Sequence, residues 1–248
     1  MTLAVAPLFS GSIDVIGDVH GEIDPLRELL GRLGYDAEGK HPDGRRLVFV
    51  GDLGDRGPDS PAVIELVRGM VEQGFAQCVL GNHELNLLRG ESKQGNRWFI
   101  APSHPEQQKG GEFAYCKVAP EALKSTWLAF FASLPLALER EDLRVVHAAW
   151  VPEEIEALRA ARGSTNRIYQ RFEARTQKQM VMEGLLQRAA AEEKEWGSKL
   201  FDRHATVPLL TGLGECDERY QMGNPVRVVT SGVERLARVP FWSSGKWR

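Results

Sequence analysis

The chain has 248 residues, of which 42% are hydrophobic and 26% charged, and its formal net charge is −3. These values indicate a soluble globular protein with one sizeable core, which we expect to be a single domain over residues 1–248. The acidic balance argues against a protein that holds nucleic acid on a basic surface. No apolar run is long enough to span a membrane, and three widely spaced cysteines favour a reducing compartment, so we expect a cytoplasmic protein.

The first part of the chain alternates short apolar runs that end at glycine with segments of helical periodicity. The apolar runs are Ser12–Gly17, Arg46–Gly51 and Ala76–Gly81, and the helical segments are Glu22–Leu33, Ser60–Gln73 and His83–Leu88. This alternation is typical of parallel strands joined by helices and predicts an α/β fold. The preceding stretch Met1–Phe9 has no basic residue, so we interpret it as a short disordered leader rather than a signal peptide.

The middle of the chain has less regular patterns. Gly, Gln, Asn and Pro are spread through Glu91–Pro120, which we predict to be a long irregular loop of the kind that is often functional. Pro120–Ala132 is predicted to be a helix. Leu134–Glu139 and Leu143–His147 are predicted to form a strand pair that turns at Glu141 and Asp142.

The last part of the chain contains a long charged stretch, Thr165–Trp196, with apolar residues near one helical face. We interpret residues 165–196 as a helical insertion that covers one edge of the fold and takes no part in catalysis. Val226–Val229 and Val233–Leu236 resemble the two strands of a late hairpin. The C-terminal part of the domain is expected to be cut short after this hairpin.

Polar side chains follow each of the three early apolar runs. The motifs are Gly17-Asp18-Val19-His20, then Gly51-Asp52-Leu53-Gly54-Asp55-Arg56-Gly57, then Gly81-Asn82-His83-Glu84. Ligands bind at the carboxyl ends of parallel strands, and neighbouring strands lie about 4.8 Å apart, so these side chains should converge. Converging carboxylates repel one another unless a cation lies between them, and oxygen and imidazole ligands favour Mn²⁺, with Fe or Zn²⁺ as alternatives.

The ordered set GDVHG, GDLGDRG and GNHE resembles the calcineurin-like metallophosphoesterases, in particular the branch of phosphoprotein phosphatases and symmetrical dinucleoside tetraphosphatases. The resemblance is dense over Ile13–Leu88, thinner around His147 and absent across Thr165–Trp196. It implies a two-sheet β-sandwich flanked by helices. It also implies a binuclear centre of two divalent ions, a phosphorylated substrate, and hydrolysis by a metal-activated hydroxide.

The resemblance also assigns roles to single residues. The first metal would be held by Asp18, His20 and Asp52, and the second by Asp52, Asn82 and His147. His83 resembles the general acid, with Asp55 as its carboxylate partner. Arg56 resembles the phosphate clamp, and Asn82 is also expected to contact phosphate.

Each assignment has a structural alternative. Asp18 and His20 could be ordinary polar residues of a loop, and Asp52 and Asp55 could form a turn pair. Asn82 could be the N-cap of a helix, and His147 could be a hydrogen-bonded core histidine. The metal and phosphate roles are favoured because the motifs occur together and in order. His41, His104 and His204 have no comparable context and are interpreted as surface or loop residues.

One feature of the family is missing from the sequence. Its members carry a further histidine late in the chain, in a Gly-His motif, and the single histidine after His147 is His204, which lacks that motif. The second metal site is therefore expected to be one ligand short and weaker. We predict a metal-dependent phosphatase that acts on a phosphoprotein or a small molecule. The alternatives are a dinucleoside polyphosphate hydrolase, and a weakly active or non-catalytic phosphate-binding module.

Overall fold

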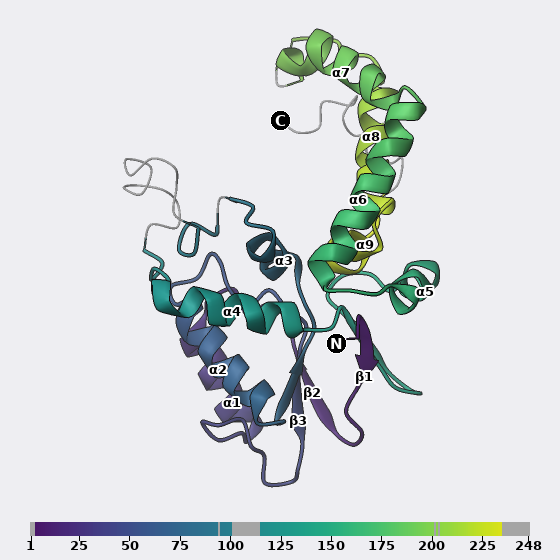
Figure 1. Cartoon of the computed structure of the whole chain (residues 1–248). Helices are drawn as coiled ribbons and strands as arrows, with labels where there is room; N and C mark the ends of the chain where they lie inside the picture. The colour runs from purple at the N-terminus through teal and green to yellow at the C-terminus, as the bar shows by residue number, and fades with distance from the viewer. Residues whose placement is uncertain (1–2, 94, 101–114, 201, 203, 235–248) are drawn as a thin grey trace.

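The computed structural model describes residues 3–93, 95–100, 115–200, 202 and 204–234. Its first half is a sandwich of two sheets with helices outside it, and its second half is helical (Figure 1). The predicted α/β fold with two sheets flanked by helices is confirmed. The division of the chain into domains stays a prediction.

One sheet is parallel and carries the three early motifs. It consists of β2 (Ile13–Ile16), β3 (Arg46–Phe49) and β4 (Ala76–Cys78), in the order β2-β3-β4. The connecting helices α1 (Ile23–Leu33) and α2 (Ser60–Glu72) bury their apolar residues in the main core, together with side chains of the central strand. These strands and helices confirm the predicted βαβ pattern.

The second sheet is mixed and includes a strand that we did not predict. β1 (Val5–Pro7) pairs in parallel with β5 (Ala137–Glu139), which pairs in antiparallel fashion with β6 (Arg144–Val146). The strand pair β5–β6 was predicted, whereas the interpretation of Met1–Phe9 as a disordered leader is wrong for residues 5–7. A separate apolar cluster joins the two sheets, and its buried members are Leu8, Val48, Val79, Leu138 and Val145.

The helices on the motif side of the sheet follow the prediction. α3 (Asn82–Leu88) begins at the third motif, and α4 (Glu121–Ser133) lies beside it. Between them, residues 91–93, 95–100 and 115–120 contain no helix or strand, as expected for this loop. His104 falls outside the described residues.

The second half of the chain departs most from the prediction. It contains α5 (Pro152–Ala160), α6 (Thr165–Met182), α7 (Leu185–Trp196), the 3₁₀ turn η2 (Gly197–Lys199), α8 (Thr211–Met222) and α9 (Pro225–Ser231). The predicted helical stretch is two helices, because Gly184 takes the left-handed conformation between them. Figure 1 shows α6, α7 and α8 as an arm that projects from the sandwich rather than covering its edge.

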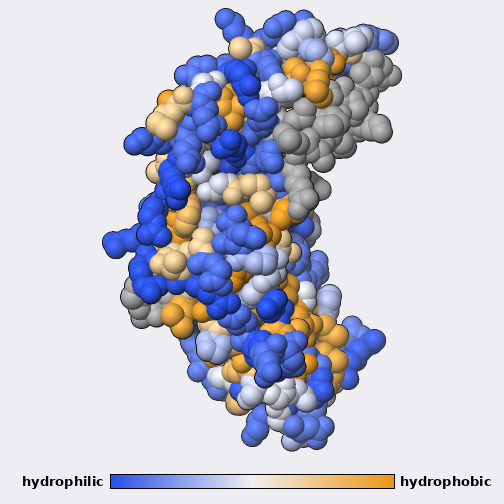
Figure 2. All heavy atoms as spheres, turned by 90° about the vertical axis from the view of Figure 1, so that its right-hand side faces the viewer, coloured by the Kyte–Doolittle hydropathy of each residue, from blue (hydrophilic) through white to orange (hydrophobic). Residues whose placement is uncertain are grey.

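The predicted late hairpin is wrong, because α9 occupies its first strand. Asn224 caps the helix by accepting a hydrogen bond from the backbone N–H of Val226, and Pro225 stands at its first turn. Leu236 lies outside the described residues. Figure 2 shows hydrophilic side chains over much of the visible face of the arm, with apolar ones between them. Within the described part of the chain, no helix combines the length and apolarity needed to cross a membrane.

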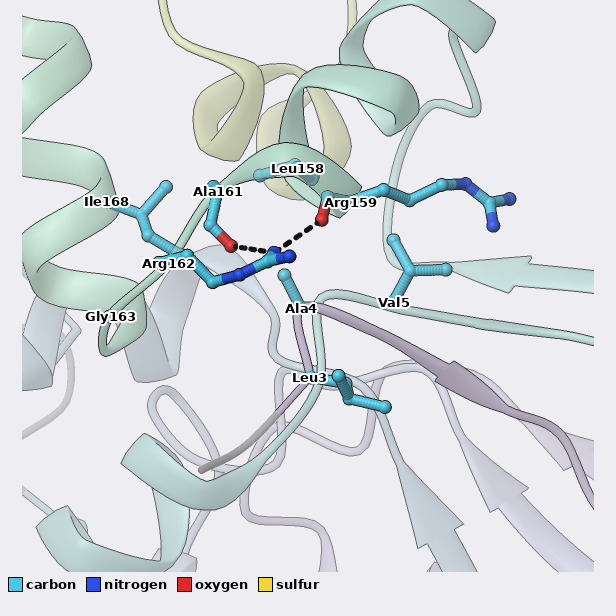
Figure 3. Close-up of a pocket in the computed structure, with 9 residues that line it drawn as sticks. All are labelled: Leu3, Ala4, Val5, Leu158, Arg159, Ala161, Arg162, Gly163 and Ile168. Carbon is cyan, nitrogen blue, oxygen red and sulfur yellow. Dashed lines mark hydrogen bonds between the residues drawn. The ribbon is translucent and has the colours of Figure 1, made fainter.

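A surface hollow of about 410 Å³ lies at the root of the arm, between β1, α5 and the start of α6 (Figure 3). Arg162 crosses it, and its Nη1 donates hydrogen bonds to the backbone oxygens of Arg159 and Ala161, 2.9 and 3.1 Å away. The guanidinium therefore satisfies carbonyl groups at the end of α5. None of the predicted site residues lines this hollow.

Candidate active site

The three motif loops meet at the carboxyl end of the parallel sheet. The backbone N–H groups of Val19 and His20 both donate to the carbonyl oxygen of Asp52, at 3.1 and 2.9 Å. The backbone N–H of His83 donates to the Asp52 Oδ1 atom at 3.1 Å. A Cβ atom on Gly81 would lie only 2.2 Å from that Oδ1 atom, so the third loop can approach the second only with glycine there.

The backbone of these loops is strained at the functional residues themselves. Among the described non-glycine residues, positive φ occurs at four positions, all of them in the first two motifs: His20, Asp52, Asp55 and Arg56, with φ of 44°, 52°, 70° and 66°. Such conformations cost about 1–3 kcal/mol each and cluster at active sites. Packing between the loops must therefore hold these side chains in their orientations.

Glu84 is the group that ties the second and third loops together. It is 1% exposed, and its carboxylate accepts hydrogen bonds from the backbone N–H groups of Asp52, Leu53 and Gly81, at 2.8, 2.8 and 3.1 Å. Burial and the nearby Asp52 carboxylate raise the pKa of Glu84 to about 7, and the backbone N–H groups of Leu53 and Asp52 oppose this. Glu84 was not among the predicted site residues, although it belongs to the third motif.

The first cluster of possible metal ligands surrounds the carboxylate of Asp52. His20 Nε2 lies 3.8 Å from Asp18 Oδ2 and 3.9 Å from Asp52 Oδ2. The other ring nitrogen, Nδ1, lies 2.9 Å from the carbonyl oxygen of Gly54. When Nδ1 donates to that carbonyl, Nε2 presents its lone pair to the two carboxylates.

The second cluster meets the same oxygen of Asp52, Oδ2. His147 Nδ1 lies 2.8 Å from the carbonyl oxygen of Val50, and its Nε2 lies 3.4 Å from Asp52 Oδ2 and 3.1 Å from Asn82 Oδ1. Burial lowers the pKa of His147, but the hydrogen bond and charge of Asp52, the Val50 carbonyl and the charge of Asp18 together outweigh this and raise the pKa to about 9. The same contact lowers the pKa of Asp52 against the effect of its burial.

These contacts fit a cation. With Nδ1 bonded to Val50, neutral His147 directs a lone pair at two oxygen acceptors, so either a proton or a metal ion must lie among them. Ligands about 2.0–2.2 Å from one ion lie roughly 3–4 Å apart, which matches the separations around Asp52. Two described groups have ligand atoms within 4.8 Å of one another: His20, Asp52 and His83, and Asp18, Asp52 and His147.

His83 is held by a buried carboxylate. Its Nδ1 lies 2.5 Å from Asp55 Oδ2, while its Nε2 lies 3.8 Å from Asp52 Oδ2. Burial lowers the pKa of His83, but Asp55 and Asp52 outweigh this, so the pKa lies above its usual value. The second oxygen of Asp55, Oδ1, accepts a hydrogen bond from Trp98 Nε1 at 2.5 Å. Trp98 belongs to the irregular loop and was not predicted as a site residue.

Arg56 spans the mouth of the site. Its Nη1 and Nη2 atoms lie 3.1 Å from His20 Nε2 and 3.3 Å from His83 Nε2. The phenol O–H of Tyr115 donates to the carbonyl oxygen of Arg56 at 2.9 Å, which steadies the strained backbone there. A guanidinium in this position can bind two phosphate oxygens at once.

The comparisons with known proteins agree with this geometry. A model of the calcineurin-like phosphoesterase family matches residues 11–149, more than half of the 248 residues. The chain belongs to this family. The matched residues include every predicted site residue of this calcineurin-like phosphoesterase, from Asp18 to His147, and end before the helical arm.

Named relatives match over part of their length. A protein of Oceanobacillus iheyensis is 35% identical over 162 residues, which cover 63% of each chain. A protein of Halalkalibacterium halodurans is 54% identical over 79 residues, which cover 31% of this chain and 32% of the relative. Both are named bis(5'-nucleosyl)-tetraphosphatase PrpE, with the qualifier asymmetrical. The chain thus spans less than two thirds of the length of these relatives. A metallophosphoesterase from Sphaerobacter thermophilus is 22% identical, with a TM-score of 0.38 over 55% of this chain and 46% of that one.

The structure brings all eight predicted site residues of this family member into one place. Asn82 is the first residue of α3 rather than its N-cap, which is Gly81, and its side chain faces His147. His41 instead holds a loop, with Nε2 at 3.1 Å from the carbonyl oxygen of Leu33. His204 lies exposed between η2 and α8 and belongs to neither cluster of possible ligands.

Proposed function

We propose that this chain hydrolyses phosphate esters or anhydrides with two divalent ions held by the clusters around Asp52. Mn²⁺ is the proposed metal, with Fe or Zn²⁺ as alternatives. The observation that carries the proposal is the convergence of imidazole, carboxylate and amide groups on the Asp52 carboxylate, beside an imidazole–carboxylate pair, His83 with Asp55. When bound, such ions supply an activated water and neutralise the phosphoryl oxygens.

The residues of the chain would carry the rest of the reaction. Arg56 would hold two oxygens of the phosphate, and Asn82 would contact the same group from the start of α3. As water adds to phosphorus, the bond from phosphorus to the leaving oxygen breaks. His83 gives the proton on Nε2 to that oxygen, and Asp55 holds the ring through Nδ1.

For the substrate, we propose a dinucleoside polyphosphate, because the named relatives are tetraphosphatases. A phosphoprotein is the second candidate, favoured by the GNHE motif and the intact pair Asp55 and Arg56. Cytoplasmic location is part of the proposal and rests on the free thiols at Cys78, Cys116 and Cys216.

A substrate panel with added Mn²⁺ tests the proposal. It contains p-nitrophenyl phosphate, its bis-ester, phosphopeptides and diadenosine tetraphosphate, and we expect the last to be hydrolysed most efficiently. Its products also distinguish two modes of cleavage, since asymmetrical cleavage gives AMP and ATP whereas symmetrical cleavage gives only ADP. Hydrolysis of none of these substrates would favour the phosphate-binding module instead.

A further inference from the structure

Trp98 contacts the His83–Asp55 pair through the Asp55 oxygen that does not face the imidazole. Its Nε1–H donates to Asp55 Oδ1 at 2.5 Å, while Asp55 Oδ2 faces His83 Nδ1 at the same distance. The two oxygens of one carboxylate thus have different partners. Rotation of the carboxylate about its terminal bond would break both contacts, so the indole fixes the orientation in which Oδ2 meets the imidazole.

Asp55 needs this contact because it is completely buried, at 0% exposure. Burying a carboxylate is costly unless its oxygens are hydrogen-bonded. Within the described residues, the side-chain donors to this carboxylate are His83 and Trp98. If the indole N–H is removed, Oδ1 has a lone pair without a donor, and the carboxylate can turn toward another one.

The indole is itself held rigidly. Trp98 is 3% exposed, and its ring packs against Phe99 and Trp127, with ring centroids 5.4 and 6.2 Å away. A Cβ atom on Gly54 would lie 2.9 Å from Trp98 Cζ2, so the second motif loop also packs directly against the indole. The side chain of Asn96 shapes the turn before it, accepting from the backbone N–H of Lys93 and donating to the carbonyl oxygen of Glu91.

We propose that Trp98 is a positioning residue for the general acid: its indole N–H sets the Asp55 carboxylate so that His83 Nε2 points at the leaving oxygen. This inference rests on the proposed function. It extends the site to the irregular segment around Trp98, residues 95–100, none of which is proposed to touch metal or phosphate. Trp98 acts through Asp55 and His83 and does not itself meet the substrate.

The test compares two phosphate monoesters that differ in their leaving group, phenyl phosphate and p-nitrophenyl phosphate. Phenolate leaves poorly without a proton, whereas p-nitrophenolate hardly needs one. For Trp98→Phe we expect kcat to fall at least about tenfold on phenyl phosphate and less than about threefold on p-nitrophenyl phosphate. General acids contribute about 10²–10⁴-fold to the rate, and loss of the positioning contact should remove part of that contribution. KM and metal content should change little. The ratio of the two rates cancels the fraction of folded enzyme, so it remains informative if the variant is unstable.

Trp127→Phe is the matched control. Trp127 belongs to the same aromatic cluster, is equally buried and also donates its indole N–H to a carboxylate, but to that of Glu65. Its loss should lower stability and leave the rate ratio unchanged. A double variant, Trp98→Phe with His83→Asn, should be no slower on phenyl phosphate than His83→Asn alone, because the group that Trp98 positions is then absent.

Should Trp98→Phe give no folded protein, Gly54→Ala displaces the indole without removing it and should change the rate ratio in the same direction. Its metal content is measured as well, because the Gly54 carbonyl oxygen lies against His20 Nδ1. Equal losses on both substrates, or no loss, would overturn the positioning role. If the wild type hydrolyses neither these esters nor diadenosine tetraphosphate, the proposed function falls and this inference with it. If the wild type and His83→Asn behave as expected and Trp98→Phe does not, the positioning role alone is wrong.

Discussion

At the scale of single residues, the two nitrogens of His83 have separate environments. Nδ1 is bonded to the Asp55 carboxylate, and Nε2 faces the cluster around Asp52 and Arg56. By distance alone, His83 could be either a metal ligand or a general acid, since its Nε2 belongs to one of the two candidate ligand groups. The proposed role as acid therefore needs a measurement that separates proton donation from metal binding.

The variant His83→Asn provides that measurement. Removal of a proton donor should slow the hydrolysis of alkyl phosphates by about 10²–10⁴-fold, and that of p-nitrophenyl phosphate far less. Metal content, measured by elemental analysis, should equal that of the wild type. Equal losses on both substrates accompanied by loss of metal would instead identify His83 as a ligand.

The sequence predicted which polar residues converge but missed the residues that hold them in place. Asp18, His20 and Asp52 belong to motifs whose order is specific, so their convergence could be inferred. Trp98 lies in an irregular loop about forty residues beyond Asp55, and no periodic pattern links them. Such contacts depend on how the loop folds back over the site, which pattern and propensity do not reveal.

At the scale of secondary structure, the success of prediction followed the strength of the local signal. The buried parallel strands read as apolar runs, and the amphipathic helices between them have clear periodicity, so both were recognised. β1 has three residues and depends on pairing with β5, a partner more than a hundred residues away. Val226–Val229 has strand propensity, but the Asn224-Pro225 cap and burial against α5 and α6 impose a helix.

The parallel sheet is also tied to its surroundings by a charged contact that can be tested by pH. Asp14 in β2 accepts hydrogen bonds from Arg45 Nε at 2.8 Å and from the phenol O–H of Tyr35 at 2.7 Å. The Arg45 hydrogen bond lowers the pKa of Asp14. The stabilisation is therefore present above about pH 4, the unfolded pKa, and is lost as the pH falls through the lower folded value.

We expect Asp14→Asn to lower the free energy of unfolding by about 1 kcal/mol near pH 7; the effect is small because the contact is partly exposed. The difference in unfolding free energy between variant and wild type should shrink as the pH falls and the Asp14 carboxylate is protonated. Urea denaturation between pH 7 and pH 3 measures this. Asp142→Asn is the control, since Asp142 pairs with Arg140 in an exposed turn and should change stability less. A difference between wild type and Asp14→Asn that stayed constant over this pH range would contradict the assignment.

At the scale of the whole molecule, the chain combines a family sandwich with a helical half beyond the matched residues. The two parts are joined by packing of α9 against α3 and of α5 against β1, and by Glu173 of α6, which pairs with Arg89 after α3. The described residues of the helical half add no ligand to either cluster. If Asp52, Asn82 and His147 hold the second ion as proposed, the described residues give that site one protein ligand fewer than the family pattern.

This shortage predicts that the two metal sites fill unequally. Changes in the groups around metal ligands alter affinity by about 10–100-fold, and a missing ligand should matter at least as much. As Mn²⁺ is added to the metal-free protein, the site of Asp18, His20 and Asp52 should fill well before the other. Activity should be absent after chelation and should follow the second site, because both ions are needed to hold the attacking and leaving oxygens.

A calorimetric titration of the metal-free protein, run beside an activity assay, decides this. His204→Ala is the control, since His204 lies in the arm and should leave both affinities unchanged. Two tight sites of equal affinity in the wild type would show that another residue completes the second site. If His204→Ala then weakened one of them, the arm would have to bring His204 to the metals in the working enzyme. Full activity without metal would contradict the metal-dependent mechanism altogether.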